Sequence, residues 1–158
     1  MANLTGRTQI FAGDTSAIDT SLQHPLGTRA FDPDGNEYIY LTGVASTVAG
    51  DWVSLDEAHL TIRTVANALG RVGIAMAAIV ASRYGWYQIY GKNTIALAIS
   101  GGGAAADAPL FLTSTAGQVD DVDVTGDFIV GAVCRVLEAS GIIAAELNYP
   151  FVEDRALD

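Results

Sequence analysis

The sequence predicts an all-β protein: a small antiparallel barrel or sandwich over residues 31–158, preceded by an extended N-terminal arm over residues 1–30. From about residue 31 onward, short runs of aromatic and β-branched residues alternate with glycine-containing turns, which favours strands. The chain contains 17 glycines, and their spacing suits a series of short strands better than a helical bundle. Residues 1–30 are polar and show no sustained apolar period of 2 or 3.6, so they cannot form much of a core by themselves.

The first strand is expected directly after a strong turn. In that turn, Pro33 presets its own φ and Gly35 accepts a positive φ. The run that follows, Tyr38-Ile39-Tyr40-Leu41, has the composition of a strand. Glycines separate later runs of the same kind, so we expect strands over residues 38–41, 52–55, 60–65, 71–79, 86–90, 94–99, 110–113, 128–137 and 142–147.

Residues 56–69 leave a second interpretation open. Asp56 could cap a helix whose apolar residues fall at positions 58, 62, 65, 66 and 69. The β-branched residues at positions 61, 62, 64 and 65 disfavour that helix because their side chains are restricted in it. We therefore prefer a strand followed by a loop.

Charge and hydrophobicity narrow the function classes. Eight Lys and Arg residues against 18 Asp and Glu residues give a formal charge of −10. This balance argues against nucleic acid and against anionic membranes as partners, because both require clustered positive charge. Half of the residues are hydrophobic and only 16% are charged, compared with about a quarter in typical domains. We therefore expect part of the surface to be covered by a partner.

The sequence predicts neither a membrane span nor a signal peptide. The longest apolar stretch, residues 72–81, is far shorter than the ~20 residues that a spanning helix needs. The first residues lack a basic region followed by an apolar run. Cys134 is the only cysteine, and its apolar neighbours predict a buried side chain in a reducing cytoplasm.

No motif of the sequence predicts catalysis. The run from Gly85 to Lys92 differs from a phosphate-binding loop, because five residues separate its glycines and Asn93 follows the lysine. There is no G-x-S-x-G motif, and nothing favours a triad around His59. We expect no catalytic residues, no cofactor and no enzymatic activity.

Metal binding is not expected either. The segment 32–37 superficially resembles a calcium loop, but its glycine is in the wrong position, so a hairpin turn is preferred. His24 and His59 have no cysteine near them in sequence, which makes zinc improbable. A solvated loop is preferred over a cation site for one acidic cluster, although both stay open: Asp120, Asp121, Asp123 and Asp127.

The most informative residues are aromatic. In the run from Tyr84 to Tyr90, alternation places Trp86, Gln88 and Tyr90 on one strand face and Tyr87 with Ile89 on the other. Large residues on both faces predict that both are covered, by a second sheet or by a neighbouring subunit. The candidate interface, with another copy of the chain or with a different partner, consists of Trp52, Tyr84, Trp86, Tyr87, Tyr90, Tyr149 and Phe151.

Several segments together resemble a known family. They are residues 43–46, 49–53, 73–78, 84–91 and 129–132, with the closing strand into Tyr149-Pro150. This series resembles the capsid decoration, or cement, proteins encoded in the head-gene clusters of tailed bacteriophages. The likeness covers about residues 36–152 and rests on glycine and alanine patterning together with the run Tyr84-Gly-Trp-Tyr-Gln.

The resemblance implies a β-rich fold, self-association and binding to the outer face of a major capsid lattice, often with an N-terminal arm. The expected protein is thus a virion component at the capsid surface, made in the cytoplasm of the host bacterium. Its expected partners are the major capsid protein and itself, as a homodimer or homotrimer, with no nucleic acid and no membrane. The alternative is a tail or fibre component that binds host glycans through exposed aromatics such as Trp52, Trp86 and Tyr87.

Overall fold

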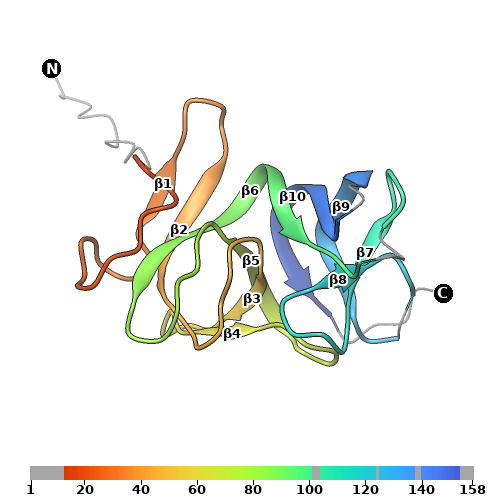
Figure 1. Cartoon of the computed structure of the whole chain (residues 1–158), viewed down its shortest axis with the longest axis horizontal. Helices are drawn as coiled ribbons and strands as arrows, with labels where there is room; N and C mark the ends of the chain where they lie inside the picture. The colour runs from red at the N-terminus through yellow and green to blue at the C-terminus, as the bar shows by residue number, and fades with distance from the viewer. Residues whose placement is uncertain (1–12, 101–103, 124, 138–139, 154–158) are drawn as a thin grey trace, which may run out of the picture.

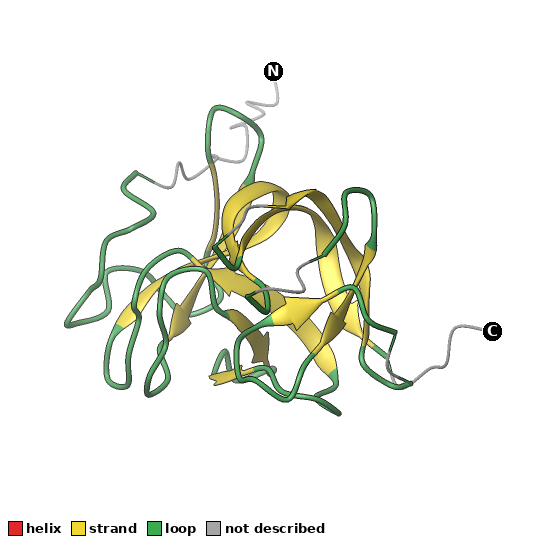
Figure 2. Cartoon of the chain, turned by 45° about the vertical axis from the view of Figure 1, so that its right-hand side comes forward, coloured by secondary structure: helices red, strands yellow, loops and turns green. Residues whose placement is uncertain are grey.

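The computed structural model describes residues 13–100, 104–123, 125–137 and 140–153, which contain strands, turns and loops but no helix (Figures 1 and 2). The all-β prediction is confirmed. In chain order the strands are β1 (Arg29–Phe31), β2 (Glu37–Thr42), β3 (Trp52–Leu55), β4 (Thr61–Arg63), β5 (Gly70–Ala75), β6 (Tyr84–Leu97), β7 (Pro109–Leu112), β8 (Val119–Asp120), β9 (Phe128–Leu137) and β10 (Ile142–Val152).

The ten strands form one antiparallel sheet with the order β1-β2-β6-β5-β10-β9-β7-β8, and β3 lies between β4 and β5. The sheet curls strongly but does not close into a barrel, which leaves a sandwich-like fold (Figure 2). At its far end, a single bridge between Ala98 and Val119 joins β8 to the chain just after β6.

Strand β6 is the longest strand and joins the two parts of the sheet. Its first half pairs with β2 and its second half pairs with β10, so it links the two sides seen in Figure 1. The sequence predicts two strands here, but Gly91 only bends one continuous strand of 14 residues. Gly91 has a φ of +93°, and a Cβ at this position would lie 2.1 Å from the Oδ1 atom of Asn36. Glycine is therefore required at the bend.

The core consists of three clusters of buried side chains. The largest is mainly aliphatic and joins β5, the end of β6 and strands β7 to β10; it includes Trp52 and confirms that Cys134 is buried. A second cluster lies between β2, β3, β5 and β6 and contains Tyr87. The third is aromatic and packs with the half-buried residues Leu26, Met76 and Tyr84; its members are Ala30, Tyr38, Tyr40 and Trp86.

Several predicted boundaries were wrong. The segment 56–69 forms the short strand β4 and loops, so the preferred strand interpretation is confirmed over the helix, with a shorter strand. Strands β1 and β8 were not expected. Strand β10 continues through Pro150 to Val152, where the sequence predicted an end at residue 147. Proline is tolerated because it falls in a register shift opposite Gly131, where no regular ladder bond is required of it.

The first residues of the expected arm, 1–12, lie outside the described residues. Residues 13–28, here called the N-terminal segment, run against β2 and β6. Asp19 exchanges two backbone hydrogen bonds with Tyr84, at 2.9 and 3.0 Å. Near the end of the segment, the Gly27 amide donates to the carbonyl of Tyr40 at 2.8 Å. The segment therefore lies over the third, aromatic cluster.

Candidate functional site

The candidate interface residues divide into buried and exposed groups. Trp52 and Tyr87 are fully buried, Trp86 is 5% exposed and Tyr84 is half-buried. Three further aromatics stay exposed on a single chain: Tyr90 at 40%, Tyr149 at 49% and Phe151 at 41%. Trp52 and Tyr87 belong to the first and second core clusters, and the other five predicted residues lie in two further places.

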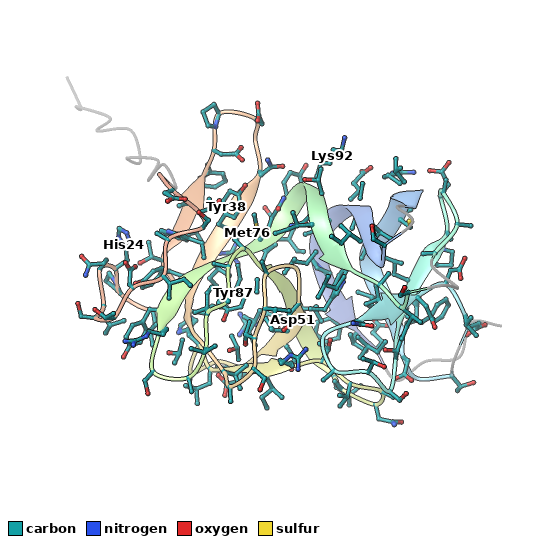
Figure 3. The ribbon with its side chains drawn as sticks, in the orientation of Figure 1. His24, Tyr38, Asp51, Met76, Tyr87 and Lys92 are labelled. Carbon is teal, nitrogen blue, oxygen red and sulfur yellow. The ribbon has the colours of Figure 1, made fainter. Side chains whose placement is uncertain are left out.

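The first place is the covered cluster, defined as Tyr38, Tyr40, Tyr84 and Trp86 under the N-terminal segment (Figure 3). The ring centroid of His24 lies 5.2 Å from those of Tyr40 and Trp86. The hydroxyl of Tyr40 donates to the Oδ2 atom of Asp19. Burial, reinforced by this carboxylate, raises the pKa of Tyr40 to about 12. The cover over this aromatic face is therefore supplied by the chain itself.

At the turn before β2, Asp32 accepts hydrogen bonds from its own loop. Its Oδ1 atom accepts from the amides of Asp34 and Asn36, and its Oδ2 atom accepts from the Tyr38 hydroxyl at 2.8 Å. Burial raises the pKa of Asp32, but these bonds outweigh it and the pKa lies below its ordinary value. The loop is a turn closed by its own carboxylate, in agreement with the preferred interpretation.

One ion pair is buried between β3 and β4. The Nε atom of Arg63 lies 2.7 Å from the Oδ2 atom of Asp51, which is fully buried, and the same guanidinium donates to the carbonyl of Ala116 at 2.8 Å. Nearby, the hydroxyl of Tyr87 is the one buried side-chain N or O atom without a hydrogen-bond partner in the described part of the chain (Figure 3). Burial raises its pKa to about 12. The ion pair between Arg63 and Asp51 and the hydrogen bond to Ala116 hold β3, β4 and the 113–118 turn together.

The predicted acidic cluster does not converge. Asp127 is buried and accepts from the amide of Asn67, Asp120 accepts from Val122, and Asp121 accepts from Ala105. Among the described residues, no group of three or more His, Cys, Asp or Glu side chains is placed to hold a metal ion.

The second place is the open aromatic face, defined as Tyr90, Tyr149 and Phe151 with Arg29 and Arg71. The rings of Tyr90 and Tyr149 lie 5.2 Å apart, and the Arg29 guanidinium lies 5.7 Å from the centroid of Tyr149. Phe151 pairs with Arg71 across the β10–β5 ladder.

A buried carboxylate anchors this face from below. Glu37 is only 3% exposed; one of its oxygens accepts from Arg29 at 2.8 Å and the other from the Tyr149 hydroxyl at 2.6 Å. The hydrogen bond to Glu37, together with partial burial, raises the pKa of Tyr149. Tyr149 also has a φ of 49°, in the left-handed region that aromatic residues rarely adopt.

A shallow hollow of about 50 Å³ lies beside Tyr149. Its floor is apolar and its rim carries the two arginines. The lining residues are Arg29, Ile39, Leu55, Arg71, Val72, Ile89, Tyr149 and Pro150. Sequence reasoning missed Arg29 and Arg71, because they belong to strands far apart in the chain and only the β-ladders bring them together.

Comparison of the chain with protein-family models, with curated proteins and with solved structures found no significant match. In the described part of the chain, no helix has the length and apolar character required to cross a membrane.

Proposed function

We propose that this protein is a structural component of a tailed-phage virion, a decoration protein that binds the outer surface of the major capsid lattice and stabilises the head. The observation that supports this most is the open aromatic face: Tyr90 and Tyr149 lie against each other, Phe151 follows on β10, and all three are at least 40% exposed, whereas Trp52, Trp86 and Tyr87 are buried. Clustered Tyr, Phe and Arg side chains are typical of protein interfaces. The sequence resemblance and the acidic charge point in the same direction.

The mechanism we propose is the burial of apolar surface. A capsid that contains packaged DNA is under outward pressure, and a subunit that bridges neighbouring capsomers opposes their separation. Apolar burial contributes about 25 cal/mol per Å², reduced by the entropy of association. Many symmetry-related copies increase the effect through avidity.

The test compares heads assembled with and without this protein. Heads that lack it are expected to release DNA at lower temperature and after milder osmotic shock, and added purified protein should restore their resistance. Equal resistance of both kinds of head would contradict the proposal.

Labelling of virions with an antibody against the protein separates this function from the alternative, a tail or fibre component that binds glycans. Staining is expected over the head. Staining confined to tails would favour the alternative, whose candidate aromatics, Trp52, Trp86 and Tyr87, are buried within the chain.

A further inference from the structure

We propose that the hollow between Arg29 and Arg71 is a socket for a second copy of this chain, and that the copy inserts the acidic loop around Val122. The two surfaces would account for the self-association that the sequence resemblance implies. This inference does not depend on whether the assembly binds a capsid.

The backbone at the socket is strained at Tyr149, and the strained conformation sets the direction of the Tyr149 side chain. Tyr149 adopts its left-handed conformation where β10 bulges against β9, opposite Gly131. Gly131 itself has a φ of +78°, and a Cβ there would lie 2.5 Å from the Asn148 carbonyl oxygen. A β-bulge changes the direction in which a side chain points, and residues with a strained backbone occur more often at binding sites than elsewhere. Here the bulge holds Tyr149 at the rim, braced by Glu37 and Arg29.

The charge at the rim favours an acidic occupant. In the described residues, Arg29, Arg63 and Arg135 form ion pairs, whereas Arg71 is exposed and donates only to the carbonyl of Asp56, at 2.9 Å. A cation without a carboxylate partner beside an apolar hollow suits an apolar side chain flanked by carboxylates. A second copy, with a formal charge of −10, offers such segments.

The loop after β8 has the matching character. Val122 is 58% exposed and stands between Asp121 and Asp123. Asp121 is held by the Ala105 amide at 2.8 Å, and Asp123 is exposed. Val122 would enter the hollow while the aspartates meet Arg71 and Arg29. In the strand order β8 lies three positions beyond β10, and no residue that lines the hollow belongs to the loop, so the contact is assigned to two different copies.

Socket and loop are different surfaces, so the contact is head-to-tail and each copy offers one of each. Repetition of such a contact gives a ring where the rotation between copies closes and an open filament where it does not, and two copies that exchange loops give a dimer. A ring of three copies or an exchanged dimer agrees with the expected homotrimer or homodimer.

The test is sedimentation analysis of the full chain and of charge-reversal variants. Wild type is expected to self-associate, and Arg71→Glu and Asp123→Arg should each weaken association at least tenfold. An equimolar mixture of the two variants should associate again, because each supplies the surface that the other has lost. Arg83→Glu, the same charge change in the loop before β6, should behave as wild type. Thermal unfolding of each variant confirms that it is folded, and Val122→Ser, a change of one exposed side chain, provides a second variant of the loop.

A wild-type chain that stays monomeric, or variants that associate as wild type does, would overturn the socket. Weakening in both variants without recovery in the mixture would also overturn it. Because the measurement needs only purified protein, the two proposals fail separately: a monomer that still binds heads refutes the socket alone, and an oligomer that ignores heads refutes the decoration function alone.

Discussion

Trp86 and Tyr90 lie four residues apart on β6, yet one belongs to the covered cluster and the other to the open aromatic face. The sequence prediction that they share a strand face is wrong: a register shift places Tyr90 opposite Glu37 and turns its side chain to the face opposite that of Trp86. At Trp86, the N-terminal segment supplies His24 and buries the indole. At Tyr90, the ring stays 40% exposed and lies at a tilt against the exposed Tyr149. The same residue types on one strand therefore have two roles: the covered rings stabilise the fold, and the open rings are available for binding.

The largest expected effect is on the covered side. Trp86→Ala should lower the free energy of unfolding by about 3–5 kcal/mol, because it removes a buried ring and leaves a cavity under the N-terminal segment. Urea denaturation measures the change. The matched variant on the open side, Phe151→Ala, should cost less than about 1 kcal/mol, since its ring is 41% exposed. Equal losses of unfolding free energy in the two variants would contradict the division into covered and open aromatic residues.

The second-largest loss of stability is expected at alkaline pH, from deprotonation of buried tyrosines. The pKa values of Tyr40 and Tyr87 are raised to about 12, above the ordinary value near 10. The native state therefore binds more protons than the unfolded state above pH 10, so their contribution is complete below pH 10 and is lost as the pH rises towards 12. For the deeply buried Tyr87 the loss amounts to about 2–3 kcal/mol.

Denaturation measured from pH 8 to pH 12 gives this loss directly. Tyr87→Phe is the matched control: it removes an unpartnered hydroxyl, so stability at pH 8 should be unchanged or higher, and the alkaline loss should shrink. An unchanged alkaline loss in this variant would show that Tyr87 is not its source.

A smaller effect is expected from the bond that fastens the N-terminal segment. Tyr40→Phe removes the hydrogen bond to Asp19 and should destabilise the fold by about 1–2 kcal/mol, because the half-buried carboxylate can then reach water. Limited proteolysis should show earlier cleavage within residues 13–28. Protection equal to that of the wild type would mean that backbone pairing alone holds the segment.

The smallest effect on stability is expected on the open side, at Tyr149. In Tyr149→Asn the loss of the bond to Glu37 is partly offset by relief of backbone strain, since asparagine tolerates positive φ. The net change should stay within about 1 kcal/mol, whereas self-association should fall at least tenfold. Loss of stability with unchanged association would assign Tyr149 to the fold instead.

The sequence alone was sufficient to predict the position of a strand where local composition and flanking turns agree. Strands β3 and β9 begin and end at the predicted residues, because β-branched and aromatic runs lie between turn residues there. It was insufficient where the outcome depends on pairing. Strands β1 and β8 have three and two residues and exist through their ladder partners. The continuation through Pro150 depends on a bulge opposite Gly131, which no local pattern encodes.

The candidate site was predictable only in part. The aromatic residues could be named, but the face on which each lies depends on the register shift between β2 and β6. Their burial depends on where the N-terminal segment lies, and its polar sequence carries no periodic signal. Arg29 and Arg71 line one hollow beside Tyr149 although β1 lies three positions from β5 in the strand order, so the curl of the sheet brings them to the same place. Exposed and covered aromatics are therefore told apart by tertiary structure alone.

The most direct test of the account is hydrogen exchange as a function of protein concentration. As copies associate, amides at the start of β5 and over residues 148–153 should gain protection, together with those around Val122, while amides of the N-terminal segment should stay unchanged. Protection gained over the N-terminal segment, with none at the open aromatic face, would contradict the account.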